Sequence, residues 1–96
     1  MIICESLTME LLNLKKKNAW TDGQLLQMIA KNSIYRREVS IFFDLQIQRG
    51  KAKPIDQMAP ELVDEIRRFV RQFSLNKTEQ MELGKACALI YQLNKP

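Results

Sequence analysis

The chain has 96 residues, with 15 Lys and Arg against 11 Asp and Glu, two Cys and no His. This length accommodates one domain over residues 1–96, whose core is too small for a deep, enclosed enzyme pocket. The absence of histidine removes the commonest general base and the commonest transition-metal ligand. Cys4 and Cys87 lack the spacing of a metal site or a disulfide framework. The composition therefore predicts a reduced cytoplasmic protein without a metal or a cofactor.

Neither a membrane segment nor a catalytic motif is visible in the sequence. Glu5 interrupts the apolar start of the chain, and no apolar run approaches the length that spans a bilayer. There is no Gly-rich phosphate loop, no Gly-x-Ser-x-Gly elbow and no carboxylate cluster suited to magnesium. Cys87 lies in an apolar helical stripe without a histidine partner, which favours a buried structural thiol. We predict that the protein is not an enzyme and has no catalytic residue.

The first third of the chain predicts two helices. Apolar residues at helical spacing indicate the first helix over Ser6–Lys17, and its three terminal lysines suit the negative end of a helix dipole. Thr21 and Gln24 then form a T-x-x-Q capping box. This box opens a second helix, which we expect to end near Asn32.

Residues 38–48 fit two different elements. Apolar residues alternate with Ser40, Asp44 and Gln46, which favours a single strand at about 38–48. A helix through Tyr35, Val39 and Phe42 is the alternative. A strand needs a partner for its backbone groups, and within the chain Met1–Cys4 is the one plausible candidate. The remaining options are intermolecular: a two-fold ribbon with a second copy, or addition to the sheet edge of a different protein. A homodimer is our first expectation.

The last third predicts two further helices. Pro60 suits the first position of a helix, with Glu61 in its first turn. Asn76 and Glu79 form an N-x-x-E capping box for the final helix. That helix is apolar on several sides, which is typical of a central helix or of one shared across a subunit interface. The predicted fold class is therefore mainly α: a small domain of four to five helices, with a possible strand at about 38–48.

The segments Ala59–Val70 and Ser74–Glu79 resemble the helix pair of ribbon-helix-helix DNA-binding proteins, a likeness that covers roughly the last 38 residues. In that family a Pro-Glu-Leu start opens the first helix, and the capped N-terminus of the second anchors a DNA phosphate. The resemblance implies that Asn76, Lys77 and Thr78 take the anchoring positions, as helix N-termini bind anions. The family's turn glycine is replaced by Ser74.

A second DNA-binding interpretation uses the middle of the chain. A helix over Gln24–Lys31, a break at Asn32-Ser33 and a following helix match helix-turn-helix spacing. Tyr35, Arg36 and Arg37 would then open the recognition helix. This interpretation and a strand at 38–48 exclude each other.

The charge is concentrated in the segment 31–53, which holds six Lys or Arg and two acidic residues and so accounts for the whole net charge of +4. Such a segment is typical of a footprint for phosphates. We therefore predict a small non-catalytic DNA-binding regulator that acts as a homodimer on duplex DNA. If residues 38–48 pair as a ribbon, Gln46 and Gln48 are candidates for base edges, since Gln pairs bidentately with adenine. The candidate phosphate-binding residues are Arg36, Arg37, Arg49, Lys51 and Lys53, together with Asn76 and Lys77 from the family resemblance.

The alternative hypothesis is a small adaptor or inhibitor that binds a larger protein complex without DNA contact. Aromatic residues and arginine dominate the energetics of protein interfaces. Tyr35, Phe42, Arg36 and Arg37 are the candidate anchors for such a partner.

Overall fold

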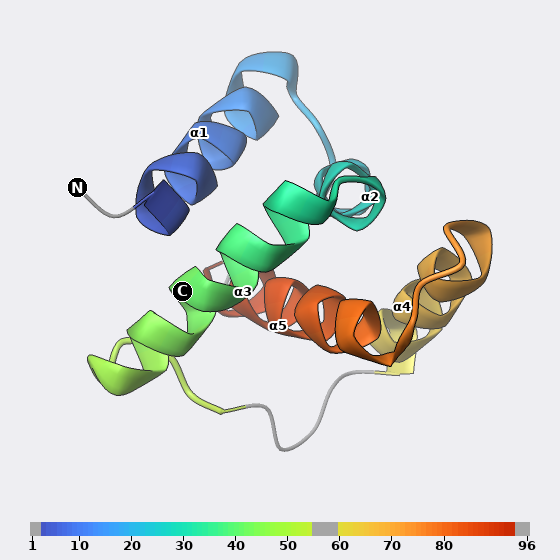
Figure 1. The fold of residues 1–96 in the computed structure, drawn as a ribbon. Helices are drawn as coiled ribbons and strands as arrows, with labels where there is room; N and C mark the ends of the chain where they lie inside the picture. The colour runs from blue at the N-terminus through green and yellow to red at the C-terminus, as the bar shows by residue number, and fades with distance from the viewer. Residues whose placement is uncertain (1–2, 55–59, 94–96) are drawn as a thin grey trace.

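The computed structural model describes residues 3–54 and 60–93, which form five helices (Figure 1). This arrangement confirms the predicted small, mainly α domain. Within the two described ranges, none of the helices combines the length and the apolar character needed to cross a membrane. The helices are α1 (Ile3–Asn18), α2 (Asp22–Lys31), α3 (Ser33–Gln48), α4 (Pro60–Gln72) and α5 (Lys77–Leu93).

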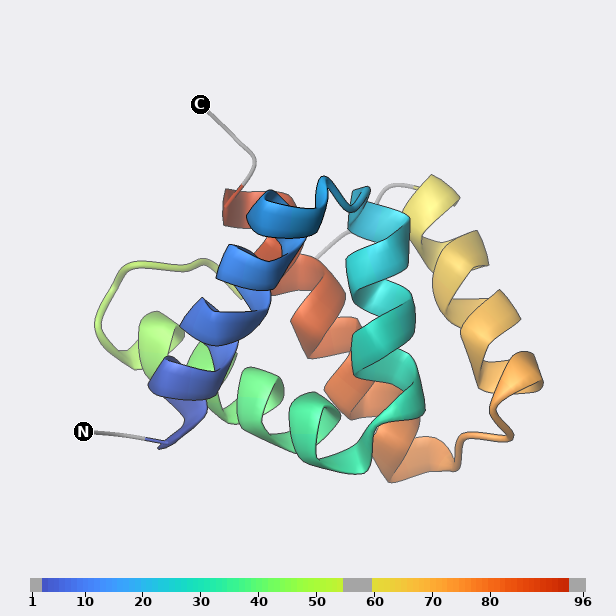
Figure 2. The same cartoon turned by 90° about the horizontal axis from the view of Figure 1, so that it is seen from above.

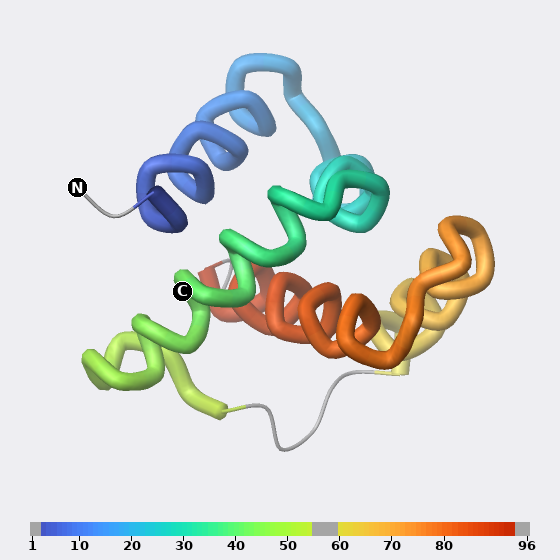
Figure 3. Tube along the Cα trace, viewed as in Figure 1, coloured from blue at the N-terminus to red at the C-terminus, as the bar shows by residue number. Residues whose placement is uncertain are grey.

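Helices α3 and α5 form the centre of the molecule. α3 packs against α1, α2 and α5, while α4 packs mainly on α5 and α2. Three contacts follow the same order along α5 and along α3 with the segment after it: Arg36 with Glu79, Asp44 with Lys85, and the Lys53 backbone with Gln92. α3 and α5 therefore run in the same general direction, as the Cα trace in Figure 3 shows. Seen from above, α3 lies along the lower edge of the molecule (Figure 2).

The core explains why α5 is apolar on several sides. Six of its residues between Leu83 and Ile90 are buried among the other helices of the same chain. Of the two alternatives predicted for this helix, the structure shows the central position, and the apolar surface of α5 gives no support to a subunit interface. The side chains with almost no exposure include Leu11, Leu25, Ile29, Val39, Phe69, Leu83 and Cys87.

Residues 38–48 are helical, so the prediction of a strand there was wrong and the alternative helix is correct. Burial of Arg36, Val39 and Phe43 follows helical spacing. Ile41, which the strand pattern groups with Val39 and Phe43, is instead 41% exposed. Packing of α1 and α5 against α3 outweighs the local β propensity of these residues. Strand pairing therefore no longer supports a homodimer.

Both predicted capping boxes are confirmed. The Thr21 N–H donates to Gln24 Oε1 at 2.8 Å, and the Gln24 N–H donates to Thr21 Oγ1 at 3.2 Å. Asn76 and Glu79 exchange the equivalent bonds at 2.9 Å each. α1 starts earlier than predicted, at Ile3, because Cys4 also faces the core. Local capping chemistry thus fixes the start of two of the helices.

Ser74 provides a stability test, because its φ of 52° lies in the left-handed region that favours glycine. It follows α4, where the Leu75 N–H donates to the Val70 carbonyl at 3.0 Å, as in a Schellman-type helix end. We expect Ser74→Gly to raise the free energy of unfolding by about 0.5–1 kcal/mol, measured by urea denaturation. Ser74→Ala keeps the Cβ and should give no gain. An equal gain from both variants would contradict this account.

Candidate functional site

The corner between α2 and α3 is built on one residue, Asn32. Its N–H donates to the Ile29 carbonyl at the end of α2, at 3.4 Å. Its side-chain Oδ1 accepts from the N–H groups of Ile34 and Tyr35 at 2.9 and 3.1 Å. Asn32 thus ends one helix and caps the next. This tight corner sets which residues of α3 face inward and which face outward.

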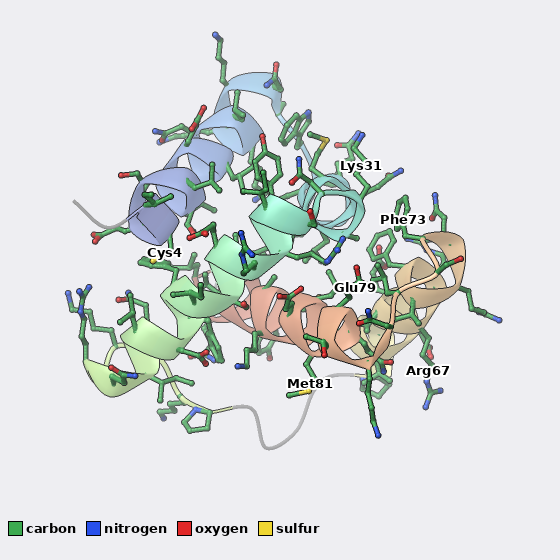
Figure 4. The ribbon with its side chains drawn as sticks, in the orientation of Figure 1. Cys4, Lys31, Arg67, Phe73, Glu79 and Met81 are labelled. Carbon is green, nitrogen blue, oxygen red and sulfur yellow. The ribbon has the colours of Figure 1, made fainter. Side chains whose placement is uncertain are left out.

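Arg36 joins three helices at one buried point. Its Nη1 donates to the Ala30 carbonyl at the end of α2. Its Nη2 donates to Glu79 Oε2 on α5 at 2.7 Å, and its Nε lies 3.6 Å from Glu82 Oε1. The residue is 4% exposed. Figure 4 shows Glu79 between α3 and the start of α5. Arg36 is therefore a structural ion-pair residue.

Two predicted contact residues are unavailable to any partner because they are buried. Arg36 cannot neutralise a phosphate, since its charge is paired with carboxylates of its own chain. Phe42 belongs to the core and cannot anchor a protein partner. Tyr35 is half-buried against that core. Among these candidates on α3, Arg37 has an exposed side chain.

The outward side of α3 carries a mixed apolar and charged surface, which we call the α3 face. Ile34 and Ile41 are 55% and 41% exposed. They lie seven residues apart, close to two helical turns, and therefore on the same side of the helix. Asp44 bonds through Oδ2 to Lys85 Nζ at 3.0 Å and keeps 45% of its side chain exposed. The α3 face consists of Ile34, Arg37, Ile41 and Asp44.

The three remaining cations of the predicted phosphate site lie just after α3. The N–H groups of Lys51 and Ala52 donate to the Gln46 carbonyl at 2.8 and 3.2 Å. The Lys53 backbone exchanges two hydrogen bonds with the Gln92 side chain, at 2.8 and 2.9 Å, which fastens this segment to the end of α5. The side chains of the three cations are exposed and make no ion pair with the residues described. We call Arg49, Lys51 and Lys53 the basic loop.

The other predicted residues do not join the basic loop into one patch. Gln48 is exposed near the loop, whereas Gln46 is half-buried. Asn76 and Lys77 lie at the opposite end of α5, whose 17 residues span about 25 Å. The Asn76 side chain already accepts the Glu79 N–H in the capping box. The nine residues predicted to bind nucleic acid therefore do not form one continuous surface.

A cleft of about 510 Å³ lies beside α4 and the first turn of α5. Its charged residues are two arginines one turn apart and one aspartate. Figure 4 shows Arg67 pointing away from the centre of the molecule. None of the lining residues is a nucleophile with an adjacent base. The lining consists of Asp64, Arg67, Val70, Arg71 and Gln80.

Cys87 is buried in the core, as the sequence predicted. Burial raises the pKa of its thiol from 9.0 to about 12, and the nearby Glu65 carboxylate adds to the increase. The thiol therefore stays protonated at neutral pH, where the thiolate would be the nucleophile. A buried thiol that stays protonated is typical of a cysteine with a structural role.

The raised pKa of Cys87 predicts a loss of stability at alkaline pH. Above pH 9 the thiol of the unfolded chain ionises, while the thiol of the folded protein keeps its proton. The contribution of Cys87 to the free energy of unfolding is therefore complete below pH 9 and falls as the pH rises towards 12. At pH 10 we expect the free energy of unfolding to be about 1.4 kcal/mol lower through this group than at pH 8. Urea denaturation at pH 8 and pH 10 measures the loss of unfolding free energy in each protein. We expect this loss to be larger in the wild type than in Cys87→Ala by that amount. An identical pH dependence in the two proteins would contradict it.

The isoleucines of the α3 face and the carboxylate partners of Arg36 were not predicted from the sequence. The strand pattern placed Ile41 beside Val39 and Phe43, whereas a helix places it on the opposite side. A helical spacing would also have shown that Arg36 shares the side of Val39 and Phe43. Once α3 is recognised as a helix, both features follow from its period.

Comparison of the chain with protein-family models, with curated proteins and with solved structures gave no match. In residues 3–54 and 60–93, no three Cys, Asp or Glu side chains are grouped so that they could hold a metal ion. The functional proposal therefore depends on surface geometry.

Proposed function

We propose that this chain is a non-catalytic binding protein that contacts another protein through the α3 face. The observation that carries the proposal is the pair of exposed isoleucines on one side of a helix whose other side lies in the core. About half of each isoleucine is still exposed, so its complete burial in a complex contributes about 0.7–1.5 kcal/mol per side chain. Arg37, exposed between Ile34 and Ile41, belongs to a residue type enriched at interface hot spots.

The composition of the α3 face favours a protein over a nucleic acid as its partner. A DNA-reading helix presents cations and amides to phosphates and base edges. The α3 face instead presents two branched apolar side chains. Asp44, whose charge is paired with Lys85, offers phosphates no attraction. These properties suit an adaptor or inhibitor.

Site-specific photocrosslinking tests the proposal. A photoreactive amino acid at position 41, in the cells that produce the protein, should form a defined crosslinked product. The same group at exposed Gln27 on α2 is the matched control and should not form that product. Arg37→Glu should reduce the yield at position 41. Absence of a product specific to position 41 would overturn the proposal, and mass spectrometry of the product identifies the partner.

Binding of duplex DNA through the basic loop is a second candidate function. Three exposed cations within five residues, held in place by the Lys53–Gln92 bonds, support it. Neutralising three phosphates gives a slope of about −2.7 for the logarithm of the binding constant against that of salt. This second function is the DNA-binding regulator predicted from the sequence, with DNA contacts limited to the basic loop.

A titration of random duplex DNA at several salt concentrations tests this candidate. Lys51→Glu should weaken binding strongly, because it reverses a charge in the centre of the basic loop. Lys77→Glu makes the same charge change at the other end of α5 and should have little effect. A larger effect of Lys77→Glu would instead support the phosphate anchor implied by the ribbon-helix-helix resemblance. Absence of binding at low salt would overturn both DNA hypotheses.

A further inference from the structure

The α3 face has a charge pattern that is complementary to itself. Arg37 lies four residues before Ile41 and Asp44 lies three residues after it, so the two opposite charges flank the isoleucine at similar distances along the helix. Arg37 makes no ion pair with the described residues. Asp44 uses Oδ2 for Lys85 and remains 45% exposed. A symmetric dimer interface needs a patch of this kind, in which residue i meets j and j meets i.

We infer that the occupant of the α3 face is a second copy of this chain, packed antiparallel about a two-fold axis beside Ile41. The inference rests on the proposed function, because it names the partner of the same surface. In this arrangement the two Ile41 side chains meet at the axis. Arg37 of each copy then faces Asp44 of the other, which gives two equivalent ion pairs around an apolar centre.

The antiparallel direction follows from the charges. A parallel pair would place Arg37 against Arg37 and would bring the two basic loops together. In the antiparallel pair, Arg49 lies eight residues from Ile41 on each side of the axis, so the two loops lie roughly 25 Å apart. That separation exceeds the Debye length of about 8 Å at physiological ionic strength, so the loops repel each other little.

An acidic protein partner fits the α3 face less well than a second copy does. Such a partner would gain from Arg37 alone, because Asp44, which is paired with Lys85 on the same side of α3, offers it no attraction. Met81 is also exposed, but Figure 4 shows it below α5, away from α3, so it adds no apolar area to this face. One helix face buries less area than the roughly 1,200 Å² of a stable interface. The dimer is therefore a weak and reversible one.

Sedimentation velocity over a wide concentration series tests this dimer. The wild type should shift from monomer to dimer as concentration rises. Ile41→Glu should stay monomeric, with an unchanged circular dichroism spectrum because Ile41 is exposed. Arg67→Glu makes the same charge change as Arg37→Glu but lies on α4, and it should dimerise like the wild type. A wild type that remains monomeric at the highest concentration would overturn the inference.

A charge exchange identifies the contact. Arg37→Glu and Asp44→Lys should each abolish dimerisation, because each variant places like charges together twice. A mixture of the two variants should restore a heterodimer, since both contacts then pair opposite charges. Failure of the mixture to associate, when both variants are folded, would overturn the two-fold model. A crosslink from position 41 to a different protein would overturn the second copy as partner but support the proposed function; no product at position 41 would overturn both.

Discussion

Replacing both carboxylates that face Arg36, in Glu79→Gln with Glu82→Gln, should lower the free energy of unfolding by about 3 kcal/mol. The guanidinium would stay buried with no counter-charge. Removal of one side of a buried ion pair costs about 3–5 kcal/mol, and the lower value applies here because the two glutamates keep 31% and 21% exposure. Urea denaturation followed by circular dichroism measures the loss.

An Arg36→Met background provides the control for this prediction. Methionine fills similar space without a charge, and replacement of a buried ion pair by apolar residues is often neutral or stabilising. In that background the two Gln substitutions should cost less than about 1 kcal/mol. After Glu79→Gln the side-chain carbonyl at this position can still accept the Asn76 N–H, because glutamine also serves at the third helical position of a capping box. An equal loss in both backgrounds would show that the glutamates act mainly through the start of α5.

Arg36 also shows why a localised excess of charge along the chain does not predict a shared cationic surface. The sequence counts charges along the chain, whereas a binding site needs charges that share a surface. Arg36 and Arg37 are adjacent, but the helical rotation of about 100° between them buries one and exposes the other. The carboxylates that pair with Arg36 lie more than 40 residues away, on α5. No local pattern predicts that pairing.

The features that depend on local interactions were predictable from the sequence. Capping boxes at Thr21 and Asn76 use bonds between residues three apart, and both appear as expected. The prediction of a strand at 38–48 was wrong because an alternation of apolar and polar residues also arises when a helix exposes one apolar residue on its outer side. Ile41 is that residue. The same exposed isoleucine misled the secondary-structure prediction and now marks the proposed interface.

The alternative adaptor hypothesis gains from this correction, although its predicted anchors change. Phe42 and Arg36 lie in the interior, and Arg37 remains on the outside. The two isoleucines beside Arg37 provide the apolar contact area that the buried phenylalanine was expected to supply. A surface of this type suits a protein contact better than a phosphate contact, because its apolar atoms gain from removal of water.

Phe69→Ala should lower the free energy of unfolding by about 3–5 kcal/mol, the usual cost of deleting a buried phenylalanine ring. Phe69 is almost fully buried and stacks on Phe73 with ring centroids 6.1 Å apart. Along α4, the other buried residue is Ile66. Because α4 packs mainly on α5 and α2, loss of this ring should weaken α4 more than the centre of the molecule.

Hydrogen exchange locates the effect of Phe69→Ala. Amides of α4 should lose protection from exchange first. Amides of α5 between Leu83 and Ile90 should keep most of their protection, because α2 and α3 still cover them. Arg67→Ala, at an exposed position of the same helix, is the control and should change stability by less than about 0.5 kcal/mol. Equal loss of protection in α4 and α5 would mean that the five helices unfold as one cooperative unit. In that case the packing of α4 would also stabilise α3 and the face that we assign to partner binding.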